Sequence, residues 1–494
     1  MLCELPPASA NETGIIFGAD LRMSGLISRL KSRPILYQDD MARPGDIRAR
    51  SRYPIASPES LLSWTSRPYF PGGTAGKSKS GYKITLPSGT LPLPLLWAPL
   101  PGAATPAASI HKTYLRAVWR SRTWLGAVLL LMRFGLWPFT MAAAAFRQVR
   151  RNAAAARAAS GKGALRQYFE LVWLCACHGF RPSNYYTFEL YRSDRFRQAA
   201  DYIHRFEMKE GVYRLLKVDT TSPLQSKEGF SRYCQAKDLP TTPIIASFAQ
   251  GQWIDRPAAD GLPQRDLFLK RTSGRGGARA ELLVFENGRY HSKRGGVYDA
   301  DELIAHAILL SRTEAYILQP REVNHEAIAD LSPSALATVR IVTVLNEMGR
   351  GETVRAVFRM GQSHDSVVDN FHAGGIAAPV NIETGELGVA TDFGLSPSVG
   401  WLDRHPATGA QIAGRQLPQW AQIKTLAERA HASFQDRIVV GWDIALTQGG
   451  LILVEGNAAA DVDNIQRPHR SPLGRSRYAE LVAWHLDRLH GARP

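Results

Sequence analysis

The chain has 494 residues, a hydrophobic fraction of 45% and a formal net charge of +16 at pH 7. This length allows a large core and more than one domain, and the composition is that of a folded protein. Residues 1–160 hold 21 Lys and Arg against 7 Asp and Glu, whereas the remaining residues are nearly neutral, with 39 against 37. A nearly neutral body argues against a nucleic-acid groove, which needs clustered basic residues.

The first 110 residues are rich in Ser, Pro, Gly and Arg and show no sustained helical or strand period. They predict a disordered or low-complexity basic segment. Residues 111–215 predict a helical region, because aromatic and aliphatic residues recur at the spacing of one buried helix face. Short strands and turns follow and predict an α+β body, which we divide into residues 216–300 and 301–490.

Within the helical region, the stretch from Trp124 to Phe139 is strongly apolar but contains Arg133 and Pro138. It has 16 residues, whereas a helix that spans a membrane needs about 20. An Ala-rich stretch with several arginines comes next. Residues 111–160 therefore suit peripheral contact with an anionic membrane, and the alternative is a helix pair packed on the body.

Four cysteines are too few for a disulfide framework, and the first apolar stretch has no basic region before it. Both features predict a reducing compartment and no signal peptide. The expected location is cytoplasmic, with the inner face of the membrane as a second possibility.

A Gly-rich loop joins two predicted strands in the next part of the chain. Asp266 to Arg271 predicts a strand, Ser273-Gly274-Arg275-Gly276-Gly277 follows at once, and Glu281 to Phe285 predicts a second strand. A P-loop or a dinucleotide fingerprint needs a helix after the loop, so both are disfavoured. A flexible loop between strands can still donate backbone N–H groups to phosphates, and Lys270 places a positive charge beside it.

Two arginines interrupt otherwise apolar predicted strands. Arg340 lies in Ala337 to Val344 and Arg359 ends the strand from Val354. A buried arginine needs an anionic partner, and phosphate is a natural one; the alternative is exposure on an edge strand. The polar loop from Asp369 to Gly375 comes next and suits contact with a ligand.

The segment from Gly441 to Asn457 predicts a β-hairpin that carries a metal site. With Gln448-Gly449-Gly450 as the loop, Asp443 lies opposite Glu455, and Asn457 points to the same face. Two adjacent carboxylates are unfavourable unless a cation neutralises them, and carboxylate and amide oxygens suit Mg²⁺. The alternative is a surface hairpin with scattered polar residues.

Taken in order, these segments resemble the ATP-grasp superfamily, over roughly residues 165–490. The sugar-transfer-associated branch is the nearest match, and a more distant likeness exists to the ligases that modify carboxylates of ribosomal or carrier proteins. The resemblance implies an ATP-grasp fold, in which two α+β subdomains grip ATP, here preceded by the basic helical region.

The resemblance also implies the residues that bind nucleotide. Lys227 and Lys270 match the two nucleotide lysines, and the backbone near Gln319 matches the hinge that reads adenine. The ribose contact would be Asn324 or Glu326. The phosphate lid would comprise Ser273, Gly274, Gly276 and Gly277.

For catalysis, the resemblance implies that Arg340 and Arg359 steady the transferring phosphoryl group, with Asn370 in the following loop. Asp443, Glu455 and Asn457 match the family's Mg²⁺ ligands, and the resemblance implies two ions. The basic N-terminal third departs from the compact α/β domain of many such ligases, so the resemblance does not identify the residues that bind the substrate.

The function that follows is an ATP- and Mg²⁺-dependent ligase. It would activate a carboxylate as an acyl phosphate for attack by an amine or another nucleophile, with a small molecule or glycan as substrate and a role in surface-polysaccharide assembly. One alternative is a kinase of a small molecule or sugar, and another is a nucleotide-binding module without activity. No nucleic-acid partner is expected, and the sequence does not indicate which oligomeric state the protein adopts.

Overall fold

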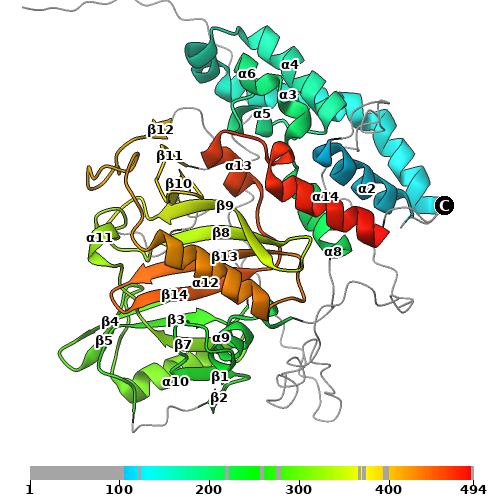
Figure 1. The fold of residues 1–494 in the computed structure, drawn as a ribbon. Coiled ribbons are helices and arrows are strands. Elements are labelled where there is room, and N and C mark those ends of the chain that lie inside the picture. The colour runs from blue at the N-terminus through cyan, green and yellow to red at the C-terminus, as the bar shows by residue number, and fades with distance from the viewer. Residues whose placement is uncertain are drawn as a thin grey trace, which may run out of the picture. The chain divides into compact units, whose positions relative to one another are not determined.

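The computed structural model describes residues 105–120, 124–216, 222–255, 261–273, 280–364, 369, 374–392 and 400–490 (Figure 1). The predicted low-complexity segment therefore lies outside the described residues up to residue 104. Helix α2 (Pro106–Arg120) already begins inside that predicted segment. The domain boundaries proposed from the sequence stay predictions.

Helices form the first part of the described chain. Helix α3 (Trp124–Ser160) is a single helix of 37 residues with Pro138 in its interior, where the sequence suggested two segments. Its residues Met141, Ala145 and Val149 pack against Leu171 and Leu174 of the next helix, and the spacing of four residues keeps them on one helix face. The elements that follow are α4 (Ala164–His178), α5 (Asn184–Thr187), α6 (Ser193–Phe196), η3 (Ala199–Asp201), α7 (Arg205–Glu207), η4 (Met208–Val212) and α8 (Tyr213–Leu215).

No helix among the described residues is long and apolar enough to cross a membrane.

The first sheet has seven strands in the order β2-β1-β7-β3-β4-β5-β6, all antiparallel to their neighbours. The two predicted strands are confirmed as β3 and β4. Residues 274–279 of the predicted Gly-rich loop between them lie outside the described residues. The bounds are β1 (Ala246–Ala249), β2 (Gln252–Asp255), β3 (Leu267–Arg271), β4 (Glu281–Glu286), β5 (Arg289–Ser292), β6 (Val297–Tyr298) and β7 (Tyr316–Pro320), with helices α9 (Lys227–Ala236) and α10 (Ala300–Leu310) and the short η5 (Pro223–Gln225).

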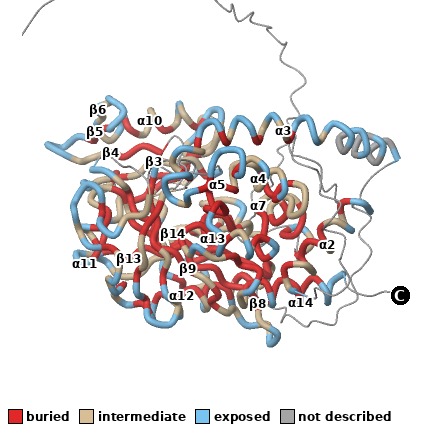
Figure 2. The backbone as a smooth tube through the Cα atoms, turned by 90° about the horizontal axis from the view of Figure 1, so that it is seen from above, coloured by how far each residue is buried: buried red, intermediate tan, exposed pale blue. Residues whose placement is uncertain are grey.

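The second sheet also has seven strands, in the order β12-β11-β10-β9-β8-β13-β14. Its central strands are buried along nearly their whole length, as the red tube of Figure 2 shows. The bounds are β8 (Thr338–Leu345), β9 (Gly351–Met360), β10 (Ile376–Val380), β11 (Ala390–Thr391), β12 (Trp401–Leu402), β13 (Val439–Thr447) and β14 (Gly450–Asn457), with α11 (Glu326–Ala329), α12 (Trp420–Ser433), α13 (Asp463–His469), η7 (Leu473–Arg475) and α14 (Arg477–His490).

The two faces of this second sheet have different cores. Ile341 of β8 joins the cluster that contains α12, whereas Val342 and Val344 join the cluster that contains α2, α8 and α14. Because side chains alternate along a strand, Arg340 and Thr338 continue the second face beyond the point where its apolar cluster ends. The sheet therefore passes from a packed core to a polar end on this one face.

Backbone contacts link the two sheets at that end. Asn324, four residues after β7, bridges to Thr447 of β13, and Thr241 bridges to Leu453 of β14. The Leu453 N–H also donates to the Pro240 carbonyl at 2.8 Å. These contacts bring β3 and β7 of the first sheet next to the hairpin of the second. Helix α9 packs on the second sheet, where Phe230, Tyr233 and Cys234 join the cluster that contains α12.

Candidate functional site

The hairpin of β13 and β14 places Asp443 opposite Glu455, which confirms the predicted pairing. The hairpin loop differs from the prediction, because it has two residues and Thr447 pairs with Gly450 instead of Leu451. Gly450 has φ of +107°, a conformation that side chains rarely adopt. One extra residue, Val454, then shifts the register between Asp443 and Ile444 and restores the predicted alignment.

Asp443 is buried and lies between two arginines. Arg340 donates to both of its carboxylate oxygens, through Nε to Oδ1 and through Nη2 to Oδ2 at 2.8 Å. Arg359 Nη2 lies 3.0 Å from the same Oδ2. Burial alone would raise the pKa of Asp443, but the two guanidinium groups outweigh it and hold the pKa below its usual value.

Arg359 contacts a second carboxylate, that of Asp369, at 3.2 Å. Thr338 completes the network, because its hydroxyl accepts from Arg359 Nη2 at 2.6 Å and donates to Asp369. Burial raises the pKa of Asp369 despite the neighbouring Arg359. Asn370, the residue predicted from this loop, lies outside the described residues.

The anionic partners of the two arginines are therefore carboxylates of the chain itself. Both residues are only 8% exposed, so the edge-strand alternative is wrong. The prediction of a phosphate partner rested on each arginine in isolation. It did not count Asp443 and Asp369, which pair with the two guanidinium groups.

Two lysines and Glu455 meet where the sheets face each other. Ser226 caps α9 by accepting from the Gly229 N–H at 2.9 Å, which fixes Lys227 in the first turn of the helix. Lys227 Nζ lies 3.5 Å from Glu455 Oε1. Lys270 projects from β3, and burial together with the positive charge of Lys227 lowers its pKa to about 8, although Glu455 opposes the shift.

The predicted hinge and lid residues are only partly described. Gln319 lies in β7 with its side-chain amide donating to the Thr242 carbonyl at 2.9 Å, and the ladder to β1 ends one residue earlier, at Leu318. Ser273 lies exposed after β3. Gly274, Gly276 and Gly277 lie outside the described residues.

Asn324, one of the two predicted ribose contacts, is engaged elsewhere. Its amide donates to the carbonyls of Ser332 and Ala335, both at 2.9 Å, and accepts from the Ala337 N–H. These bonds shape the turn that leads into β8. Glu326 is exposed on α11 and is the one of the two whose side chain faces solvent.

The donor set on the hairpin fits a hard divalent cation. The Glu455 side chain is 37% exposed, so its oxygens are accessible to a cation. The Asn457 amide nitrogen is buried without a hydrogen-bond partner among the described residues; it is a donor, so the ligand from this side chain would be the amide oxygen. Asp443 can join them only by sharing oxygens now bound to arginine. Among the described residues, no group of three or more His, Cys, Asp or Glu side chains could hold a metal ion by itself. The candidate ligands on the hairpin are therefore two carboxylates and one amide.

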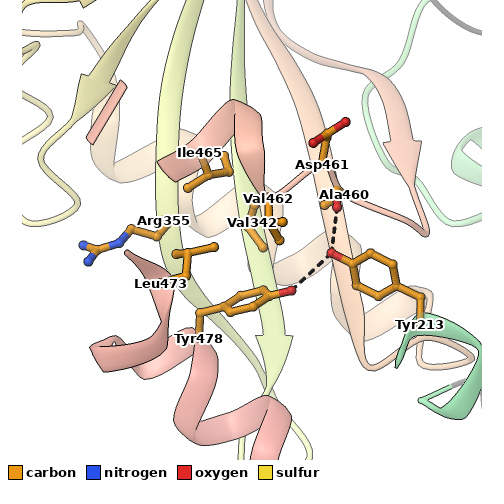
Figure 3. Close-up of a pocket in the computed structure, with 9 residues that line it drawn as sticks. All are labelled: Tyr213, Val342, Arg355, Ala460, Asp461, Val462, Ile465, Leu473 and Tyr478. Atoms are coloured by element: carbon orange, nitrogen blue, oxygen red, sulfur yellow. Dashed lines mark hydrogen bonds between the residues drawn. The ribbon is translucent and has the colours of Figure 1, made fainter. Parts of the chain in front are cut away.

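The helical region reaches the same end of the sheet (Figure 3). The Tyr213 hydroxyl donates to the Ala460 carbonyl at 2.7 Å, and Arg205 and Lys209 each lie 2.6 Å from Asp461 Oδ2. A Cβ on Gly441 would lie 2.9 Å from the Ala460 Cβ and 3.3 Å from Arg340 Cδ, so glycine permits this close approach. A pocket at this junction is lined by Tyr213, Val342, Arg355, Ala460, Asp461, Val462, Ile465, Leu473 and Tyr478.

The geometry now permits comparison with known proteins. The model of the family described as "Sugar-transfer associated ATP-grasp" matches residues 213–475, which is more than half of the chain. The chain belongs to this ATP-grasp family. The match begins at Tyr213, the residue that contacts Ala460, and so leaves most of the helical region outside it. No curated relative matches the chain.

Several solved structures match the chain at low sequence identity and low TM-score. D-alanyl-alanine synthetase A from Vibrio cholerae has 13% identity and a TM-score of 0.31, over 54% of this chain and 65% of that one. The L-amino acid ligase from Bacillus licheniformis has 11% and 0.31, over 61% and 59%. The ADP complex of N5-carboxyaminoimidazole synthetase from Staphylococcus aureus has 8% and 0.25, over 48% and 44%. The chain thus spans less than two thirds of each, and such distant likeness says nothing of substrate.

In this ATP-grasp chain the sequence missed Asp369 and Thr338 as members of the site. The signal was present, because a second buried arginine needs a second carboxylate and Asp369 opens the polar loop already singled out. The contact between Lys227 and Glu455 had no such signal, since Lys227 begins helix α9, Glu455 lies in β14, and the two residues are 228 positions apart.

Proposed function

We propose that the chain is an ATP- and Mg²⁺-dependent ligase that activates a carboxylate as an acyl phosphate. The observation that carries the proposal is the meeting of Lys227, Lys270 and Glu455 between the two sheets, beside a buried network of two arginines. Lys227 and Lys270 lie near Glu455, which is paired on the hairpin with Asp443 and so lies beside its two arginines. These positive groups suit the triphosphate of a nucleotide, which carries several negative charges.

The residues divide into those that bind phosphate and those that stabilise its transfer. Lys227 and Lys270 would bind the nucleotide phosphates as point charges. Arg340 and Arg359 would neutralise charge on the transferring group, and both are held rigidly by Asp443 and Asp369. Mg²⁺, held by Glu455, Asn457 and Asp443, would supply further positive charge to the phosphates when bound.

The reaction itself balances as two displacements. An oxygen of the substrate carboxylate attacks the terminal phosphorus of ATP, and ADP departs with the electrons of the broken P–O bond. An amine then attacks the acyl carbon and releases inorganic phosphate. Preorganised charge lowers the barrier to the first step, so little general-base catalysis is required.

The acceptor substrate would approach from the side of the helical region. Arg205 and Lys209 lie there against Asp461, four residues after Asn457, and Arg181 and Asp463 belong to the same charged cluster. The three cationic side chains of this cluster suit an acceptor that carries a carboxylate. The family name points to glycan assembly, so we propose a sugar acid or a glycan-linked acid as the acceptor class.

A paired screen tests this function. The chain would be incubated with MgATP and with sugar acids and amino acids, singly and in pairs, and release of ADP and phosphate would be followed. We expect phosphate release that requires both a carboxylate and an amine. A phosphorylated product with no amine requirement would assign the kinase instead, and nucleotide binding without turnover for any pair would assign a binding module.

ATP affinity should depend on pH through Lys270. The free amino group has a pKa of about 8, below its ordinary value of 10.5, and bound phosphate favours its protonated form. Affinity is therefore highest below pH 8 and falls about tenfold from pH 7.5 to pH 9, as the free lysine loses its proton. Calorimetric titration of ATP across this range measures the effect.

Lys270→Arg is the matched control for this pH dependence, because an arginine stays charged throughout the range. Its ATP affinity should change little between pH 7.5 and pH 9. An equal decline in both proteins would show that another group titrates.

A further inference from the structure

The large apolar side chains that the structure exposes are concentrated in one part of the chain. Among the side chains that the structure describes, helix α3 exposes seven of them, with Trp124 79% and Phe139 75% accessible. Exposed large apolar residues elsewhere, such as Leu309, Met348 and Leu489, stand far apart in the sequence. The exposed residues of α3 are Trp124, Val128, Leu131, Met132, Leu136, Phe139 and Phe146, and α4 adds Leu165, Phe169 and Trp173.

The seven residues of α3 form one helical face, here called the α3 apolar face. At about 100° per residue they fall within an arc of roughly 140°. The buried residues Met141 and Ala145 lie outside this arc, toward α4, and Val149 lies at its edge, at the helical angle of Leu131. Figure 2 shows most of α3 pale blue with buried turns recurring along it. Most of the α3 apolar face is therefore not the side that joins α3 to its neighbours.

The charge on α3 has a single sign, and so has the charge of the sequence on either side of it. Residues 60–169 contain 15 Lys and Arg and no Asp or Glu. On α3 itself, Arg147, Arg150, Arg151 and Arg157 are all exposed and follow the apolar residues. At the same helical angle as the apolar residues lie Arg150 and Arg157. A surface that combines exposed Trp, Phe and Leu with exclusively positive charge is complementary to an anionic apolar phase.

We propose that α3 docks this protein on an anionic lipid surface, with the α3 apolar face in the headgroup region and the arginines on lipid phosphates. This goes beyond the proposed catalytic function. Since no described helix can cross a membrane, the contact is a peripheral one. A second copy of the chain would bring like charges together, and nucleic acid would leave the Leu, Val and Met side chains without a partner.

Vesicle binding by the full-length chain tests the proposal. Cosedimentation would be measured with phosphatidylcholine vesicles, with and without phosphatidylglycerol. We expect binding that requires the anionic lipid and weakens as salt rises. Leu131→Gln, Leu136→Gln and Phe139→Gln together should weaken it at least about tenfold, because three apolar side chains no longer leave water. Replacing Arg147, Arg150 and Arg157 by Gln should remove the preference for anionic lipid.

Leu309→Gln, Met348→Gln and Leu489→Gln together are the matched control. They remove equally exposed apolar side chains outside α3 and should bind vesicles as the wild type does. Circular dichroism and thermal unfolding would establish that each variant folds. Failure of the full chain to bind vesicles would overturn the proposal, and so would equal vesicle binding by the α3 variant. A wild-type chain that forms a dimer or binds nucleic acid through α3, and does not bind lipid, would overturn it as well.

Discussion

Glu455→Gln should reduce ATP turnover at least about a hundredfold while leaving the protein folded. The substitution removes one negative charge from the proposed cation ligands and so weakens charge stabilisation worth several kcal/mol, where each 1.4 kcal/mol is a factor of ten. Glu455 is 37% exposed and its contact with Lys227 is 3.5 Å long. Loss of such a partly exposed pair should change the free energy of unfolding by less than about 1 kcal/mol.

Glu383→Gln is the matched control for this variant. Glu383 is exposed in the turn after β10, where its backbone N–H donates to Asn381. It should turn over ATP at the wild-type rate. Turnover would be measured as ADP release at saturating MgATP, and stability by urea unfolding. Full activity of Glu455→Gln would remove Glu455 from the cation site.

Asp443→Asn should lose activity to a similar extent but should also lose stability. Asp443 is buried between Arg340 and Arg359, which are buried as well. Removal of the carboxylate leaves two guanidinium groups without their main partner, which costs about 3 kcal/mol. The loss of stability is no larger than this because Asp369 still contacts Arg359.

Urea unfolding without nucleotide separates the two variants at neutral pH. The pKa of Asp443 is below its usual value, so its contribution to stability is fully present there and is lost only as pH falls into the acid range. We expect Asp443→Asn to be clearly less stable than Glu455→Gln. Equal stability would mean that the arginines do not hold Asp443 in the ligand-free protein.

Local patterns in the sequence were enough to predict the strands that carry the site. Arg340 and Arg359 lie in strands because β-branched residues surround them, and the hairpin follows from two apolar runs around a Gly-containing loop. The pairing of Asp443 with Glu455 was predicted from an incorrect loop length. The bulge at Val454 compensates for the error in loop length. The residue pattern of a single strand does not predict where a bulge occurs.

Contacts between distant segments could not be predicted in the same way. The partner of a buried arginine depends on which carboxylate the topology brings near, and that requires the register of β8 with β9 and β13. Helix α3 illustrates a second limit. Its composition suggested an amphipathic membrane segment, but only the structure shows which side packs on α4 and which side stays exposed.

The most direct measurement of the central claim is trapping of the acyl phosphate with hydroxylamine. Hydroxylamine replaces the natural amine and converts an activated carboxylate into a stable hydroxamate. With MgATP and the carboxylates of the screen, we predict a hydroxamate whose formation requires ATP, Mg²⁺ and one class of carboxylate. One ADP should be released for each hydroxamate formed. The Glu455→Gln variant should form no hydroxamate. ADP release with a stable phosphorylated product and no hydroxamate for any carboxylate would contradict the ligase mechanism.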